Sequence, residues 1–260
     1  TTGKKDNKFG MPFDDAVTVY NKFNMHPHLN LVGLTMHIGS QLLDMQPFAE
    51  AYARLRDLVQ TLRGLGYTVQ RLDLGGGIGI PYRPNETPPN MSVYAGIVHD
   101  SVGDLGCSLS LEPGRSLVGN GGYLLARVIE VKQTQSATYL ILDAAMNDLP
   151  RPAMYQAFHA IVPLQKQAHD GQPATVYDVV GPICESSDFL AKDRDLPRFS
   201  RGELIAVMSA GAYGFTMASN YNSRPKPPEV LVDGSDYSVV IQRQSYEDLV
   251  AGENVPGGLS

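Results

Sequence analysis

The first 116 residues alternate between helix-like and strand-like patterns of apolar side chains. The clearest helix covers 46–66, where large apolar residues recur at helical spacing and two glycines can end the helix. Its apolar positions are Phe48, Tyr52, Leu55, Val59 and Leu62. Further helices are predicted from Asp14 to about Phe23 and over 91–106, and strands over 31–40, 69–77 and 107–116. This alternation predicts parallel strands, and therefore an α/β layer or a β/α barrel.

The pattern changes near residue 120, within the run Gly119-Asn120-Gly121-Gly122. Beyond it, short segments rich in β-branched residues are separated by turn residues, and only one helix is expected, over 153–160. The strand-like segments are 123–134, 138–146, 175–182, 202–211, 228–234 and 237–243. This half therefore predicts an antiparallel β-domain. We expect two domains, residues 1–120 and 121–260.

Composition and charge narrow the function classes. Hydrophobic residues make up 43% of the chain and charged residues 18%, which is typical of a globular protein. The net charge is −6 and no basic run stands out, so nucleic acid is a poor candidate partner. No apolar run approaches the roughly 18 residues that span a bilayer, and no signal peptide is recognised at the polar N-terminus. Two cysteines allow at most one disulfide, so we expect a cytoplasmic protein.

Polar and glycine-rich motifs stand at the ends of the three predicted parallel strands. They are HIGSQ (37–41), GGGIG (75–79) and EPGR (112–115). In a β/α barrel the carboxyl ends of the strands form the face that carries the active site. The glycine run lacks the dinucleotide-binding spacing, which leaves a phosphate site and a simple tight turn as open alternatives. An arginine in EPGR could bind a carboxylate or phosphate, or form a surface ion pair.

Two other kinds of site find little support. His26-Pro27-His28 is the only close histidine pair, and no thiol or carboxylate joins it at ligand spacing, so no metal site is expected. The chain also has no G-x-S-x-G motif that would place a serine nucleophile on a tight turn.

Three motifs in the second half also carry candidate chemistry. NDLPRPAMY (147–155) holds Arg151 and Tyr155, GPICESSD (181–188) joins a thiol to a carboxylate, and Tyr213 stands among small residues. Each has a structural alternative: a free cysteine is usually a small buried hydrophobe, and Tyr213 could fill a packed β-corner. The individual motifs do not decide between these interpretations.

Taken in order, HIGSQ, LDLGGGIGIPY, EPGR, MNDLPRPAMY, GPICESSD and SAGAYGFTMASNYNSRP resemble the diaminopimelate decarboxylase family. These are pyridoxal-phosphate enzymes built on an alanine-racemase-like barrel. The resemblance covers nearly the whole chain, and EPGR, RPAMY and CESSD together are specific to the family. It implies the C-terminal portion of a pyridoxal-phosphate-binding β/α barrel followed by an antiparallel β-domain. It also implies the reaction that converts meso-2,6-diaminopimelate to L-lysine, the last step of lysine biosynthesis.

The resemblance implies roles for individual residues in binding pyridoxal 5'-phosphate. The ring of His37 would stack on the cofactor, and Glu112 would pair with its pyridine nitrogen. The phosphate would be held by Ser40, Gly77 and the backbone of the EPGR turn. The full implied set for the cofactor is His37, Ser40, Gly77, Glu112, Gly114, Arg115 and Tyr213.

It likewise implies a substrate site shared between two subunits. Cys184 would return a proton to the α-carbon, and the CESSD loop would reach the active site of the partner subunit of a homodimer. The residues implied to contact the amino-acid substrate are Arg115, Arg151, Tyr155, Glu185 and Tyr213.

The chain departs from the family pattern at its start. By the resemblance only strands six to eight of the barrel are present, and the lysine that binds the cofactor covalently lies in the missing part. Lys4, Lys5 and Lys8 belong to a loop and are not candidates for it. We therefore expect this chain alone to be inactive. Two alternatives stay open: a decarboxylase of another basic amino acid, of the ornithine or arginine type, and a non-catalytic regulatory homologue.

Overall fold

The computed structural model describes residues 8–165, 171 and 173–257, so Lys4 and Lys5 lie outside the described residues. The chain divides into two units, Thr1–Gly119 and Asn120–Ser260. Among the described residues, no helix has both the length and the apolar character that a membrane crossing requires.

A parallel three-stranded sheet organises the first unit. Its strands lie in the order β1, β2, β3, with Leu34 beside Leu72 and Leu72 beside Leu109. The parallel arrangement predicted from the sequence is therefore confirmed, although the regular strands are shorter than the apolar segments. The strands are β1 (Gly33–Thr35), β2 (Arg71–Asp73) and β3 (Ser108–Ser110), and the helices are α1 (Ala16–Phe23), α2 (Gln46–Gly64), α3 (Met91–Val102) and α4 (Arg115–Val118).

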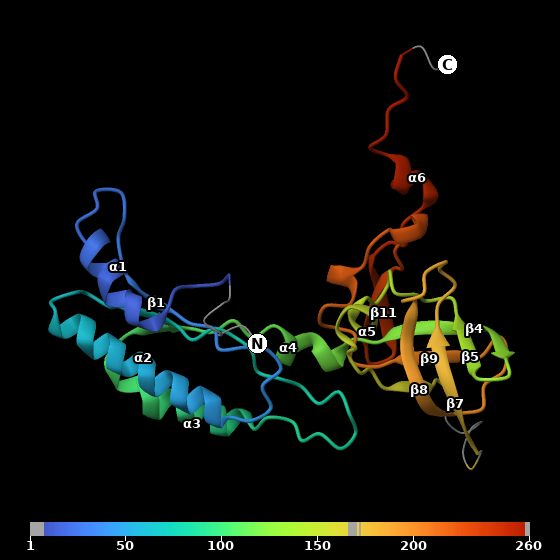
Figure 1. Ribbon diagram of the computed structural model, residues 1–260, viewed down its shortest axis with the longest axis horizontal. Coiled ribbons are helices and arrows are strands. Elements are labelled where there is room, and N and C mark those ends of the chain that lie inside the picture. The colour runs from blue at the N-terminus through green and yellow to red at the C-terminus, as the bar shows by residue number, and fades with distance from the viewer. Residues whose placement is uncertain (1–7, 166–170, 172, 258–260) are drawn as a thin grey trace. The chain divides into compact units, whose positions relative to one another are not determined.

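The core of the first unit lies along α2, and all five apolar positions predicted for that helix are buried. Helix α3 runs beside α2 (Figure 1) and adds Tyr94 to this core. The hydroxyl groups of Tyr52 and Tyr94 are 2.9 Å apart, and the ring of Phe48 meets the ring of Tyr94 edge-on at 5.3 Å. This pairing satisfies two phenol groups inside an apolar environment. Helix α3 begins at the side-chain cap of Asn90 and ends at Val102, earlier than predicted.

A six-stranded sheet organises the second unit, with a separate two-stranded hairpin (Figure 1). The order in the larger sheet is β6, β9, β4, β5, β7, β8. Its fully buried side chains include Leu140, Leu142, Leu190, Ile205 and Val207. The strands are β4 (Leu124–Gln133), β5 (Thr138–Leu142), β6 (Ile161–Pro163), β7 (Ala174–Val180), β8 (Phe189–Pro197), β9 (Leu204–Val207), β10 (Glu229–Asp233) and β11 (Asp236–Ile241), and the helices are α5 (Arg151–Tyr155) and α6 (Tyr246–Val250).

Two predictions for this half need correction, and one long strand was not predicted. The sheet is mixed rather than wholly antiparallel, because β5 and β7 pair in parallel, with Leu140 beside Val179. The helix predicted over 153–160 instead covers Arg151–Tyr155, since Gln156 takes a left-handed conformation (φ 53°) that ends it. Strand β8 was not predicted, because its charged residues hide the apolar pattern.

Glycines allow the ends of the first unit's strands to approach closely. A β-carbon at Gly75 would lie 2.2 Å from the carbonyl oxygen of Met36, and one at Gly76 would lie 2.3 Å from that of Glu112. Both distances are far below van der Waals contact. The glycine run after β2 therefore fixes the spacing of the chain segments that follow all three strands.

We predict that Gly76→Ala destabilises the protein by about 1–3 kcal/mol, because the added methyl group must push the Glu112 backbone away. The matched control is Gly96→Ala, on the exposed side of α3, where an added β-carbon meets nothing within 4 Å. That change should stabilise the protein by about 0.5–1 kcal/mol, as alanine favours helix. Urea unfolding of the two variants checks both values. Equal effects of the two substitutions would contradict this account of the glycine run.

Candidate functional site

The ends of the three parallel strands bring four of the predicted site residues to one edge of the first unit's sheet. His37 and Ser40 follow β1, Gly77 follows β2, and Glu112 follows β3. The segments are tied together by the backbone, since the N–H of Glu112 donates to the carbonyl of Gly75 at 2.9 Å. His37, Ser40 and Glu112 are exposed.

Gly77 occupies a position that no other residue fits. Its φ is +98°, and a β-carbon there would lie 2.2 Å from the carbonyl oxygen of Gly39 and 3.8 Å from Cε1 of His37. The glycine therefore lies directly beside the imidazole and leaves its own backbone uncovered by a side chain.

Arg115 begins α4 immediately after Gly114 and is half-buried. Its Nη1 donates to the hydroxyl of Tyr82, and its guanidinium lies over the same ring at 5.6 Å. The backbone N–H of Tyr82 donates in turn to Glu86 at 2.7 Å. Sequence reasoning missed Tyr82, although it ends the LDLGGGIGIPY motif.

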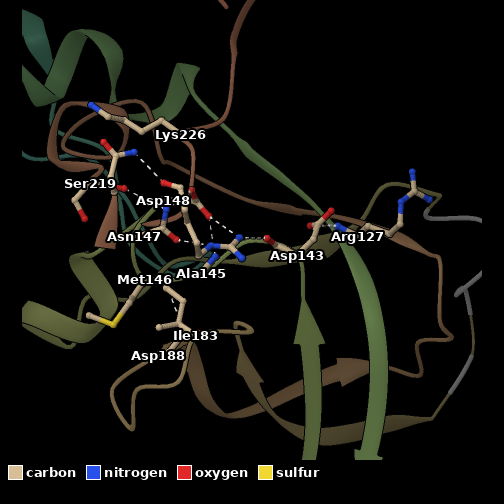
Figure 2. Close-up of polar contacts among 12 residues, drawn as sticks. Arg127, Asp143, Ala145, Met146, Asn147, Asp148, Ile183, Asp188, Ser219 and Lys226 are labelled. Atoms are coloured by element: carbon tan, nitrogen blue, oxygen red, sulfur yellow. Dashed lines mark hydrogen bonds and ion pairs between the residues drawn. The ribbon is translucent and has the colours of Figure 1, made fainter. Parts of the chain in front are cut away.

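In the second unit, the parallel pairing of β5 and β7 places two motifs side by side. The MND segment follows β5 and the GPICESSD loop follows β7, so both leave the same edge of the sheet. A hydrogen bond joins them, from the backbone N–H of Met146 to the side-chain Oδ1 of Asp188 at 2.8 Å (Figure 2). Gly181 allows this approach, because a β-carbon there would lie 2.5 Å from Oδ2 of Asp188.

Three buried polar side chains form what we call the buried cluster: Asn147, Asp148 and Asp188. Asp188 is 4% exposed, and besides Met146 it accepts the backbone N–H of Ile183 at 2.8 Å, which closes the GPICESSD loop. Asp148 accepts the backbone N–H of Ala145 at 2.9 Å and the amide of Asn147 at 2.9 Å. Figure 2 shows these contacts converging on the segment after β5.

Arg224 connects the buried cluster to a third segment, the SNYNSRP stretch. Its Nε donates to Oδ1 of Asn147 at 3.0 Å, its Nη2 donates to the carbonyl of Asp143 at 2.6 Å, and Asp148 lies 3.9 Å away. Burial raises the pKa of Asp148, an effect that the Ala145 N–H and the charge of Arg224 partly offset. The buried cluster and Arg224 thus hold together three segments that lie far apart in the sequence.

Cys184 and Glu185 are exposed within the loop that Asp188 closes. Oε1 of Glu185 accepts the backbone N–H of Ser187 at 3.2 Å, and Oε2 accepts the hydroxyl of Tyr221 at 3.0 Å. These bonds, the Ser187 N–H first and the Tyr221 hydroxyl second, lower the pKa of Glu185. The loop therefore presents a thiol next to a carboxylate that is ionised at neutral pH.

The remaining predicted residues lie on neighbouring elements of the second unit. Arg151, the first residue of α5, is 8% exposed and its Nη1 bonds Nε2 of His159 at 2.8 Å. Tyr155, at the end of the same helix, is exposed. Tyr213 is exposed and has a left-handed backbone (φ 59°), a conformation that a tyrosine rarely adopts.

The structure thus forms two separate groups from the predicted residues, one in each unit. The first is the strand-end group of His37, Ser40, Gly77 and Glu112; the second is the loop group of Cys184 and Glu185, which Asp188 joins to the segment leading into α5. Residues that support these groups were not singled out from the sequence: Tyr82, Asn147, Asp148, His159, Asp188, Tyr221 and Arg224. Most of them lie within the sequence motifs described above. A polar residue without an assigned role in such a motif was therefore the signal that could have identified them. Among the residues that the structure describes, no group of His, Cys, Asp and Glu could hold a metal ion.

Comparison with known proteins identifies relatives across nearly the whole chain. Residues 17–211 match the family described as pyridoxal-dependent decarboxylase, C-terminal sheet domain. The diaminopimelate decarboxylases of Pseudomonas aeruginosa and Vibrio cholerae are each 47% identical over 98% of this chain and 60% of their own length. The crystal structure of diaminopimelate decarboxylase from Helicobacter pylori complexed with L-lysine matches with a TM-score of 0.88 and 38% identity, over 96% of this chain and 61% of that one. The chain therefore spans about 60% of the length of these relatives.

We predict that Asp188→Ala loosens the GPICESSD loop, because the buried N–H of Ile183 and the partly buried N–H of Met146 lose their acceptor, at a cost of up to about 1–3 kcal/mol each. Hydrogen exchange of the Met146 and Ile183 amides should accelerate strongly. Ser186→Ala, at an exposed position of the same loop, is the control and should leave both amides protected. Unchanged protection in Asp188→Ala would show that the carboxylate does not hold the loop.

Proposed function

The chain belongs to the pyridoxal-dependent decarboxylases, and from this premise we propose that it is the C-terminal part of an enzyme that converts meso-2,6-diaminopimelate to L-lysine. One observation carries the proposal: an exposed thiol and an ionised carboxylate, Cys184 and Glu185, share a loop that Asp188 ties to the segment leading into Arg151. A substrate with an amino group and a carboxylate at each end requires an anion, a cation and a proton donor close together. The names of the relatives support the same substrate.

The strand-end group fits pyridoxal phosphate. Gly77, where a β-carbon would strike the Gly39 carbonyl, leaves backbone exposed beside the ring of His37. We assign the phosphate to Ser40, Gly77 and Gly114, the ring face to His37, and the ring nitrogen to Glu112. A carboxylate there would keep that nitrogen protonated. Bound pyridoxal phosphate supplies an electron-withdrawing ring that stabilises negative charge at the α-carbon after CO₂ is lost.

Arginine and tyrosine side chains would orient the substrate. Arg151 and Arg115 offer planar donors that match a carboxylate, and Glu185 offers a negative charge for the distal ammonium. Tyr155 and Tyr213, both exposed, would border the same substrate, with Tyr213 and Arg115 also near the cofactor.

Cys184 would act as the catalytic acid. Its S–H would give a proton to the α-carbon after CO₂ departs, forming the new C–H bond and leaving a thiolate. The exposure of Cys184 supports this role, since its thiol is accessible to a ligand.

We further propose a homodimer in which the loop group of one subunit completes the site of its partner, as the family resemblance implies. Exposure of Cys184 and Glu185 on a closed loop supports it. A cytoplasmic location suits a biosynthetic enzyme whose cysteines, Cys107 and Cys184, are both free thiols.

The proposal predicts that the chain alone, with added cofactor, shows no turnover, whereas the completed enzyme releases CO₂ and L-lysine from meso-diaminopimelate. By completed enzyme we mean this chain joined to the N-terminal barrel strands that its relatives carry. Substantial turnover by the 260-residue chain would contradict the first part. Absence of turnover by the completed enzyme would favour a non-catalytic homologue. Full activity of Arg151→Ala would favour another basic amino acid as substrate, one without a distal carboxylate.

Substituting each of the two cysteines in the completed enzyme distinguishes a catalytic role from a packing role. Cys184→Ala should lower kcat by about 100-fold or more through loss of the proton donor, with little change in stability. Cys107→Ala should mainly affect stability, because Cys107 is half-buried and its sulfur lies 3.2 Å from Nη2 of Arg63. Steady-state kinetics and thermal unfolding of both variants check this. Parallel losses that track stability in both would remove Cys184 from the chemistry.

A further inference from the structure

His159 is fully buried, with 0% of its surface exposed, and both ring nitrogens make short bonds. Nδ1 lies 2.8 Å from the carbonyl oxygen of Met208, and Nε2 lies 2.8 Å from Nη1 of Arg151. The histidine stands in the short segment between α5 and β6, eight residues after the arginine that it contacts.

These two contacts determine the protonation of the ring. A backbone carbonyl can only accept, so Nδ1 must carry the hydrogen. A guanidinium can only donate, so Nε2 must offer its lone pair to Arg151. A doubly protonated ring would direct an N–H, and a second positive charge, at the guanidinium. His159 is therefore a neutral imidazole in one tautomer.

The sheet of the second unit fixes the position of this imidazole. The backbone N–H of Met208 donates to the carbonyl of Ala160 at 2.8 Å, which continues the pairing of β6 with β9. The carbonyl of His159 itself accepts from Nη1 of Arg194 at 3.0 Å. The main chain of His159 is thus held by Arg194 and its ring by the Met208 carbonyl, and this arrangement directs Nε2 toward Arg151.

We propose that His159 is a positioning residue that sets the guanidinium of Arg151 for the carboxylate of the substrate, an inference that rests on the proposed function. A neutral partner suits this task. A carboxylate in the same place would orient the arginine but would also neutralise its charge and compete with the substrate. Imidazole accepts one N–H, restricts rotation of a long side chain, and adds no negative charge of its own beside the guanidinium.

Two variants of the completed enzyme separate this role from a merely structural one. In His159→Asn the side-chain nitrogen can replace Nδ1 and keep the bond to Met208, but the shorter side chain no longer reaches Arg151. In His159→Gln the longer side chain can place its oxygen near Nε2 and accept from Arg151, while the bond to Met208 is lost. Each variant therefore removes one of these two contacts of the His159 ring and keeps the other.

We expect His159→Asn to raise KM for meso-diaminopimelate about tenfold with a smaller change in kcat, and His159→Gln to restore KM to near the wild-type value. Titration calorimetry adds a readout that does not need turnover. L-lysine, which keeps a carboxylate, should bind about tenfold more weakly to His159→Asn, whereas 1,5-diaminopentane, which has none, should bind equally to both variants.

The outcomes distinguish failure of this inference from failure of the proposed function. An active wild-type enzyme in which the two variants share the same KM and the same lysine affinity would overturn the role of His159 alone. A wild-type enzyme that neither turns over diaminopimelate nor binds lysine would overturn both the proposed function and the inference. Selective weakening of lysine by His159→Asn, with recovery in His159→Gln, supports the positioning role.

Discussion

The second unit depends on a carboxylate that is removed from water and satisfied by backbone. Asp188 accepts the N–H groups of Met146 and Ile183, each at 2.8 Å, from the two loops that follow β5 and β7. Burying a carboxyl group is costly unless hydrogen bonds compensate, and here the hydrogen bonds that compensate also join the two loops. The bonds exist only when both loops hold their native conformations, so the carboxylate couples the two. The exposed Cys184 and Glu185 lie in the loop that this contact closes.

The first unit reaches a comparable result without buried charge. Its strand ends are held by main-chain packing, in which glycines allow the backbone of one strand to touch that of the next. Polar side chains such as His37 and Glu112 are then free to remain exposed, because they are not needed to hold the segments together. The two units therefore hold their loops in place by different means. The first unit uses close backbone contacts at glycines, and the second uses buried polar residues beside the exposed side chains of Cys184 and Glu185.

The sequence predicted an element correctly where one local pattern determined its structure. Helix α2 was predicted because its buried residues repeat at helical spacing, and the parallel sheet of the first unit followed from the order of its elements. Prediction from the sequence failed where long-range pairing decided the outcome. The parallel contact between β5 and β7 joins segments more than thirty residues apart, and no local pattern distinguishes it from an antiparallel one. The roles of Asp188 and Arg224 were hidden for the same reason, since a polar residue in a loop is normally solvated.

Two carboxylates in the second unit show how the same chemical group is adapted to different tasks. Asp148 is buried, and burial raises its pKa despite the nearby charge of Arg224. Glu185 is exposed, and donors from Ser187 and Tyr221 lower its pKa. The first group therefore contributes mainly as a hydrogen-bond acceptor within the cluster, where its neighbours are fixed. The second keeps its negative charge at neutral pH at a position that a ligand can reach. Under the proposed function, Glu185 is therefore the carboxylate that would meet the substrate, whereas Asp148 holds the segment after β5 through its bonds to Ala145 and Asn147.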